Sequence, residues 1–358
     1  MKSKKSAPQR TGLGLDDREA AILRSVIRQH IVSGEPIGSR AVSKGPQLDL
    51  SPATIRNIMA ELEERGFLSQ PHTSAGRVPT PKAYRLYVDR MIRRPRMSSS
   101  QIQAIDRAML ASRGEITDLL AEASRQLSRF SNQVGVVLAP EIRRIVVEHV
   151  EFVRLDTRRV VAVVVGRSGV VHNRILDVVE PLEQRELDRI GRYLSEQFGG
   201  RTLPEIRDLL RRRMSEERAA YDRLVARSLE LGRRTVEAES GEAEVFVDGA
   251  SNLMDSPEFA DPDKIKGLMQ ALEQKQTLIT LLGRVLQDEG LQVVIGGEDP
   301  PASDLAQCSL VATTYGTGDR VMGTLGVVGP TRMEYAHAIA LVDYLAQVLT
   351  RFFSPTGN

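Results

Sequence analysis

Four closely spaced residues have side chains suited to contacting the edges of base pairs in double-stranded DNA. They are Ala53, Thr54, Arg56 and Asn57. Arginine can donate two hydrogen bonds to guanine, asparagine can form two with adenine, and the methyl group of threonine can contact that of thymine. The same residues would also suit the solvated face of an ordinary amphipathic helix. The elements that surround them must therefore decide between the two interpretations.

The four residues fall in the first two turns of a predicted helix from Ser51 to Arg65. Ser51 followed by Pro52 is typical of an N-cap with proline at the first helical position. Apolar residues at i, i+3, i+4 and i+7 form the opposite face: Ile55, Ile58, Met59 and Leu62. Because a helix N-terminus attracts phosphate, Ser51 is a predicted contact to the DNA backbone.

Two further helices precede this one. Apolar residues at steps of three and four predict a helix from Leu15 to Ser33 that ends at Gly34. Ser39 is predicted to cap a short helix from Arg40 to Lys44. We expect Ser39 and Arg40 to contact phosphate groups, since they begin a helix that lies close in sequence to the base-contacting one.

A hairpin is predicted after the third helix, with strands near Leu68 and Val78. Arg77 is placed to reach a phosphate or the minor groove, and the small Thr73 and Ser74 allow close approach to the DNA backbone. A solvated turn is the alternative. Another helix opens at Thr80, and the arginines at 93–96 indicate a linker. Three helices followed by such a wing indicate a winged helix-turn-helix domain.

Charge is distributed unevenly over the 358 residues. Residues 1–100 hold 18 Lys and Arg against 9 Asp and Glu, a net of +9, so the remainder carries −7 of the total of +2. This asymmetry favours nucleic-acid binding, although a solvated tail or a membrane-surface patch would also fit.

No apolar run is long enough to span a bilayer, and the N-terminus lacks the apolar segment of a signal peptide. We therefore expect a cytoplasmic protein.

Residues able to support catalysis or bind a metal are sparse. Cys308 is the single cysteine, and the five histidines show no metal-ligand spacing. Gly316-Thr317-Gly318 lacks the third glycine of a dinucleotide-binding loop. We expect Cys308 to be a small buried residue, and we expect no enzyme activity, no metal and no cofactor.

The acidic remainder predicts an α+β arrangement of several domains. A helical segment at 98–131 has an apolar seam that would either pair two chains or pack on the following domain. Thr331 and Glu334 are predicted to form a capping box before a C-terminal helix. Strands at both ends of a helical stretch predict one sheet domain with an insertion. The strands are expected at 134–138, 145–155, 160–165, 170–176, 291–295, 309–315 and 321–328, and the charged helices at 181–199 and 203–238.

Several ordered segments resemble the family of heat-inducible transcription repressors called HrcA. The resemblance covers nearly the whole chain and is carried by Leu15-Asp16-Asp17-Arg18-Glu19, Gly34-Glu35-Pro36-Ile37-Gly38-Ser39-Arg40, Ser51-Pro52-Ala53-Thr54-Ile55-Arg56-Asn57 with Met59, Gly66-Phe67-Leu68, His72-Thr73-Ser74-Ala75-Gly76-Arg77-Val78-Pro79-Thr80, Gly249-Ala250-Ser251-Asn252-Leu253, Pro257-Glu258-Phe259, and Gly323-Thr324-Leu325-Gly326-Val327-Val328-Gly329-Pro330-Thr331-Arg332-Met333-Glu334-Tyr335. It implies that the sheet domain is GAF-like and that its mainly helical insertion serves dimerisation. The domains expected are a basic leader at 1–14, a winged-helix domain at 15–96, a linker helix with the first part of the GAF-like domain at 97–180, the insertion at 181–260, and the second part of the GAF-like domain at 261–358.

The resemblance also implies a function. A homodimer would repress chaperone operons by binding an inverted-repeat operator of the CIRCE type, and the GroEL chaperonin would keep it active. Two other functions remain open at this point. One is a regulator whose GAF-like domain senses a small molecule, and the other is a module that contacts another protein instead of DNA.

Overall fold

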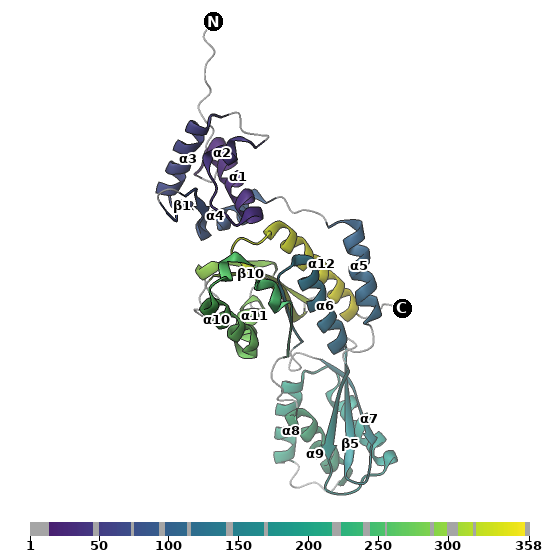
Figure 1. Ribbon diagram of the computed structural model, residues 1–358. Helices are drawn as coiled ribbons and strands as arrows, with labels where there is room; N and C mark the ends of the chain where they lie inside the picture. Colours follow the sequence, from purple (N-terminus) through teal and green to yellow (C-terminus); the bar gives the residue numbers. More distant parts are fainter. Residues whose placement is uncertain are drawn as a thin grey trace.

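The chain forms three units arranged along one direction in the computed structural model (Figure 1). We call them the N-terminal unit (14–92), the sheet unit (97–140 and 244–354) and the intervening unit (146–238), which lies between the two parts of the sheet unit in sequence. The structure describes residues 14–45, 50–72, 75–92, 97–112, 116–140, 146–167, 171–216, 223–238, 244–254, 256–286, 290–298, 307–317 and 320–354. The predicted leader up to Leu13 and the predicted linker at 93–96 lie outside these ranges.

The N-terminal unit has the predicted order of three helices, a hairpin and a further helix. Its elements are α1 (Asp17–Ser33), α2 (Ser39–Ser43), α3 (Pro52–Glu64), β1 (Leu68–Ser69), β2 (Val78–Pro79), α4 (Pro81–Leu86) and a π-helical turn η1 (Tyr87–Met91). Buried apolar residues from all three first helices meet in one core, among them Leu23, Ile27, Val42, Ile55, Met59 and Leu62. The apolar periodicity of the sequence therefore predicted the core of this unit.

Local signals set the ends of these helices. The side chain of Asp16 accepts hydrogen bonds from the first turn of α1, and Gly34 ends that helix with a positive φ of 71°. The prediction that Ser39 caps α2 is wrong, because Gly38 occupies the N-cap and Ser39 is the first helical residue, with its side chain buried. The Ser39 side chain is therefore buried within the first turn of α2 and does not cap the helix.

The sheet unit is a five-stranded antiparallel sheet in the order β7-β3-β10-β9-β8. Helices α6 and α12 pack on one face and α10 and α11 on the other, so the sheet is buried on both faces. Its strands are β3 (Val134–Leu138), β7 (Val245–Asp248), β8 (Gln292–Ile295), β9 (Cys308–Thr317) and β10 (Arg320–Pro330). Its helices are α5 (Ser99–Ala111), α6 (Ile116–Ser131), α10 (Pro262–Glu273), α11 (Lys275–Val285) and α12 (Tyr335–Phe353), with 3-10 turns η4 (Ala250–Leu253), η5 (Pro257–Phe259) and η6 (Gly296–Glu298).

The apolar seam of α6 packs inside its own chain. Leu120, Ala123 and Leu127 are buried against β3 and α12. Gly135 allows this close approach, since a Cβ atom there would lie 2.2 Å from the Ser124 carbonyl oxygen. Of the two interpretations of the seam, packing on the adjoining domain is the one that the structure favours.

The intervening unit differs from the predicted division of the chain. We expected its strands to belong to the main sheet. They form a separate antiparallel sheet in the order β4-β5-β6. Helices α7, α8 and α9 pack with this sheet, and together they form a core that is separate from that of the main sheet. Conversely, β7, expected within the insertion, pairs with β3 of the main sheet. Hydrophobic patterning identified the strands, but pairing partners depend on contacts distant in sequence. The elements are β4 (Val147–Arg154), β5 (Arg159–Gly166), β6 (Val171–Asp177), α7 (Gln184–Phe198), α8 (Leu203–Glu216) and α9 (Arg223–Ala238).

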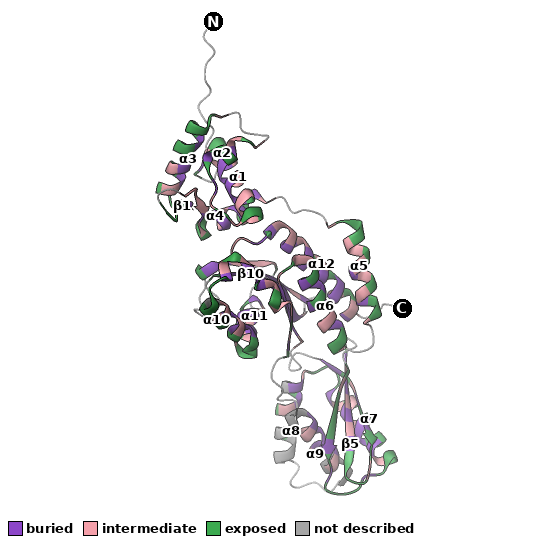
Figure 2. Ribbon diagram, in the orientation of Figure 1, coloured by how far each residue is buried: buried purple, intermediate pink, exposed green. Residues whose placement is uncertain are grey.

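The start of the C-terminal helix also differs from its prediction. Glu334 occupies the N-cap of α12 without a side-chain capping hydrogen bond. The Thr331 hydroxyl donates instead to the carbonyl of Gln307, at 3.0 Å. The predicted capping box is therefore absent, because Thr331 has a partner on another segment. Figure 2 shows α12 as mainly buried and intermediate, and its exposed positions are Asp343, Gln347 and Arg351.

Candidate nucleic-acid interface

The first two turns of α3 present a polar, unobstructed face. Ala53, Thr54, Arg56 and Asn57 are all exposed, while Ile55 between them is fully buried. No described residue forms a hydrogen bond or ion pair with the Arg56 guanidinium or the Asn57 amide. Both side chains are therefore available to a ligand. The predicted base-contacting residues thus lie together on one accessible helix face. Figure 2 shows that part of α3 is exposed.

Ser51 holds the start of this helix in place. Its hydroxyl oxygen accepts a hydrogen bond from the Thr54 amide at 3.1 Å, and it lies 3.0 Å from the Thr54 hydroxyl. The N-cap predicted from sequence is confirmed. Replacing the cap would fray the turn that carries the predicted base contacts, so Ser51 orients these residues whether or not it also contacts phosphate.

The two residues predicted at the start of α2 are in different environments. The side chain of Arg40 is exposed, whereas that of Ser39 is 9% exposed. Only the backbone amide of Ser39 remains suited to an anion contact of the kind expected from a helix start. Arg40 keeps its predicted ability to contact a phosphate group.

The hairpin joins α3 through an ion pair that the sequence pattern did not indicate. The Arg77 guanidinium contacts the Glu63 carboxylate with both Nε, at 2.8 Å, and Nη2, at 2.7 Å. The backbone of Arg77 also pairs with Ile37, which adds a third extended segment to the hairpin. A Cβ atom on Gly76 would lie 2.5 Å from the Ile37 backbone, so this pairing requires glycine. The predicted contacts Thr73 and Ser74 lie outside the described residues.

Two substitutions with opposite expected effects on DNA affinity test whether Arg77 contacts phosphate. We expect Arg77→Ala to weaken binding to every duplex sequence alike and to lower the slope of log affinity against log salt by about one. Glu63→Gln removes a competing carboxylate from Arg77, and it should strengthen binding alike for all sequences. Fluorescence anisotropy with operator and scrambled duplexes at several salt concentrations measures both. An unchanged salt slope in Arg77→Ala would assign this residue a purely structural role.

Comparison with known proteins identifies the family of the chain. The model of the HrcA protein C-terminal domain matches residues 117–339. A heat-inducible transcription repressor HrcA from Geobacter sulfurreducens is 41% identical over 337 residues, which are 94% of this chain and 98% of the relative. The chain belongs to the HrcA family. A repressor of the same name from Syntrophobacter fumaroxidans is 35% identical over 345 residues, covering 96% and 99% of the two chains.

A solved structure supports the fold of this HrcA-family chain. A crystal structure titled as that of a hypothetical protein matches with a TM-score of 0.61 at 22% identity. The match covers 95% of this chain and 98% of the other. At this level of identity the likeness concerns the fold alone, and it extends over all three units.

Two of the histidines, His149 and His337, have hydrogen-bond partners within the chain. Among the described residues, no group of three or more His, Cys, Asp or Glu is arranged to hold a metal ion. Nε2 of His149 lies 3.1 Å from a carboxylate oxygen of Glu151 on the same strand, β4, and Nε2 of His337 lies 2.8 Å from the Phe130 carbonyl oxygen. No helix in the described ranges is long and apolar enough to cross a bilayer.

Burial controls the reactivity of the cysteine. Cys308 begins β9 in the core, and burial raises the pKa of its thiol to about 12. At pH 8 the thiolate fraction is therefore very small. We expect iodoacetamide to leave Cys308 unmodified in the folded protein and to modify it after unfolding in guanidinium, as measured by intact mass. Rapid modification of the folded chain would contradict this environment.

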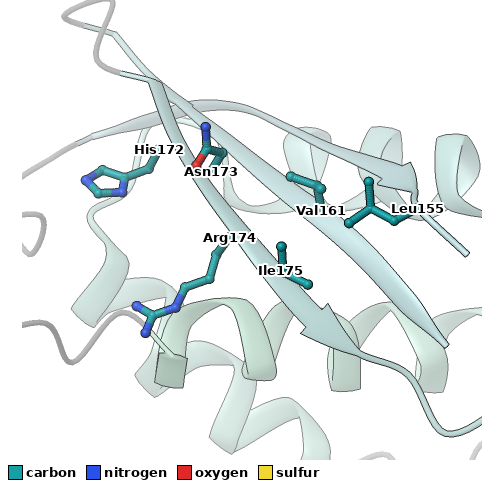
Figure 3. A pocket seen from close by; sticks show the side chains of 6 residues that line it. All are labelled: Leu155, Val161, His172, Asn173, Arg174 and Ile175. Carbon is teal, nitrogen blue, oxygen red and sulfur yellow. The ribbon is translucent and has the colours of Figure 1, made fainter. Parts of the chain in front are cut away.

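The outer face of the sheet in the intervening unit carries a patch of partly exposed apolar residues, next to the exposed Glu151 and Asn173. Register pairs Val161 of β5 with Val153 and Ile175 on its two sides. Val153 is 45% exposed, Leu155 48% and Ile175 58%. An open hollow along the edge strand β6 is lined by Leu155, Val161, His172, Asn173, Arg174 and Ile175, and Figure 3 shows its aliphatic side chains near one another. Large exposed apolar residues gathered in this way are typical of an interaction surface.

Proposed function

We propose that this HrcA-family protein is a non-enzymatic transcription repressor that binds double-stranded DNA through α3. The observation that carries the proposal is the exposed, unpaired face formed by Arg56 and Asn57 at the start of this helix. The relatives are named heat-inducible transcription repressors, which assigns the class of function. Helices α2 and α3 with the hairpin then act as a winged helix-turn-helix domain, whose recognition helix enters the major groove.

Charge along α3 agrees with this orientation. The acidic residues Glu61, Glu63 and Glu64 lie in the last turns, away from the helix start, and Glu63 is paired with Arg77. The positive end of the helix dipole therefore faces the DNA, and the acidic end points away from it. The residues that contact bases are Ala53, Thr54, Arg56 and Asn57. A second set contacts the sugar-phosphate backbone or positions the residues that do: Ser39, Arg40, Ser51, Thr73, Ser74 and Arg77.

The protein acts as a homodimer, and the intervening unit supplies the dimer contact. The apolar outer face around Val153, Val161 and Ile175 is the exposed surface suited to such a contact. A two-fold axis through this face would present two DNA-binding units to an inverted repeat. The separate sheet and core of the intervening unit support residues 146–238 as the insertion, and we propose that the five-stranded sheet unit is the GAF-like domain.

The proposed operator is of the CIRCE type upstream of chaperone operons, and the GroEL chaperonin is the proposed regulatory partner. Chaperonin binds non-native repressor and returns it to the folded state. It thereby increases the fraction of repressor molecules that can bind DNA. Heat stress diverts chaperonin to other unfolded proteins and so lowers that population. This mechanism needs no ligand, metal or enzyme activity in the repressor.

The experiment compares a CIRCE-bearing duplex with a scrambled duplex of equal length. Binding of the full chain is measured at two or more salt concentrations, with and without chaperonin. We expect preference for the operator by about 10³ or more that survives moderate salt. Equal and steeply salt-sensitive binding to both duplexes would overturn sequence-specific repression. Full operator binding through heat-shock temperatures without chaperonin would overturn the regulatory mechanism alone.

A further inference from the structure

The N-terminal unit meets the sheet unit at a buried aromatic contact. Tyr84 of α4 and Tyr335 of α12 are 2% and 0% exposed, and their ring centroids lie 5.8 Å apart. The hydroxyl of Tyr84 lies 2.8 Å from Nδ1 of His30, which is near the end of α1. One apolar core cluster extends through both units at this place. The two units are therefore packed together and not merely tethered.

We call this contact between the N-terminal unit and the sheet unit the joint. Arg332 makes polar contacts across it. Its Nη1 donates to the Ile31 carbonyl of α1 at 3.0 Å, while its Nε pairs with the carboxylate of Glu258. The guanidinium lies over Gly34, where a Cβ atom would be 3.4 Å from its Cζ. The Ile31 carbonyl belongs to the last turn of α1, where a cation is favoured by the helix dipole. Arg332 therefore clamps the end of α1 to the sheet unit.

A second arginine reaches across the joint in the opposite direction. Arg85 of α4 donates through Nη2 to the Val293 carbonyl of β8 at 2.6 Å, and its guanidinium pairs with Glu298. Its side chain is 33% exposed, against 18% for Arg332. Arg85 and Arg332 contact different segments, β8 and the end of α1, so together they restrain rotation of one unit on the other more than either contact would alone.

Three segments that carry the family resemblance converge at Arg332 although they are far apart in sequence. They contain Gly34, Glu258 and the run from Arg332 to Tyr335. The proposed base contacts involve none of them. In Figure 1, α4 borders the sheet unit while α3 stands away from it, so the joint leaves the DNA-contacting face free.

We propose that Arg332 fixes the angle of each DNA-binding unit relative to its sheet unit and thereby selects the spacing between operator half-sites. It does so through its contacts with Glu258 and the Ile31 carbonyl, and Arg85 supports it. This inference rests on the proposed function as a dimeric repressor. Arg332 is a positioning residue, since it contacts Glu258 and Ile31 and is not among the proposed DNA contacts. Because the dimer holds two such units, their fixed angles determine which half-site separation both α3 helices can occupy at once.

The DNA experiment uses inverted repeats whose spacer is varied one base pair at a time, together with a duplex that holds one half-site. We expect the unsubstituted protein to prefer one spacer. Arg332→Gln should flatten this preference and weaken binding at the preferred spacer about tenfold, if the competent angle is populated one-tenth of the time. Half-site affinity should change less than about twofold. Arg332→Lys, which keeps the charge, should recover part of the spacer preference.

Arg125→Gln is the matched control. It removes the same charge from the same unit, and Arg125 pairs only with Glu122 on its own helix among the described residues, at 2.5 Å. Its spacer profile should equal that of the unsubstituted protein. A spacer profile in Arg332→Gln that is unchanged, or tighter binding at the preferred spacer, would overturn the inference.

A second measurement tests the clamp without DNA. Spin labels on Glu64→Cys in α3 and Gln103→Cys in α5 report the distance between the two units, because both positions are exposed and Cys308 is buried. Helix α5 is bound to the sheet unit, where the Tyr344 hydroxyl donates to Asp106 at 2.6 Å. With labelled chains diluted in unlabelled protein, Arg332→Gln should broaden the distance distribution. An unchanged distribution refutes the clamp even if operator binding fails for other reasons.

Discussion

Arg56→Ala and Asn57→Ala should each weaken operator binding about 5- to 150-fold, the equivalent of ~1 to 3 kcal/mol for one lost base contact. Binding to scrambled DNA should change much less for Asn57→Ala, because this residue contributes no charge. Arg56→Ala should also lower the salt slope, since a cation is removed. In both variants the base preference at one operator position should relax. Competition binding with single-base operator variants measures this change.

The structure offers a contrast within the same helix turn. Ile55, directly before these two exposed residues, is fully buried. Ile55→Ala should lower the free energy of unfolding by about 2 to 5 kcal/mol, whereas Arg56→Ala and Asn57→Ala should leave the midpoint of thermal unfolding nearly unchanged. If all three substitutions lower stability and none alters base preference, the assignment of the two faces of α3 is wrong.

Ile175→Glu should convert the dimer to monomers and weaken binding to the full inverted repeat by about 10² or more, because linkage of the two DNA-binding units is lost. The carboxylate would be placed on the proposed apolar interface and would have to be desolvated there. Sedimentation velocity measures the oligomeric state. Affinity for a single half-site should stay the same.

Met254→Glu serves as the control for this surface. Met254 is 57% exposed and Ile175 58%, but Met254 belongs to the sheet unit. The same apolar-to-acidic change there should leave the dimer intact. A dimer that persists in Ile175→Glu would move the interface elsewhere, without affecting the proposal that α3 binds DNA.

Local physical chemistry explains why the N-terminal unit could be predicted so closely. The N-cap at Ser51, the glycine that ends α1 at Gly34 and the 3.6-residue periodicity of Ile55, Met59 and Leu62 all act within a few residues of one another. These signals determined which face of α3 is buried, and hence that Arg56 and Asn57 are exposed. The burial and low reactivity expected for Cys308 likewise followed from its apolar neighbours in sequence.

Other features depend on partners that are distant in sequence. The ion pair of Arg77 with Glu63, the pairing of β7 with β3 and the separation of β4, β5 and β6 into their own sheet all required the tertiary structure. A strand pattern states which side chains are buried but not which edge the strand joins. The Thr331 hydroxyl could have formed a capping box with Glu334 or a hydrogen bond with a distant segment. In the folded protein it donates to the carbonyl of Gln307.

The joint at Arg332 shows this limit most clearly. The sequence by itself determined the helices, the strands, the buried faces and the family, because each depends on local order or on ordered motifs. Nothing local indicates that Arg332 would reach Glu258 and the end of α1, 301 positions away at Ile31. Such contacts form only when the units pack, and packing decides how the DNA-binding face is oriented.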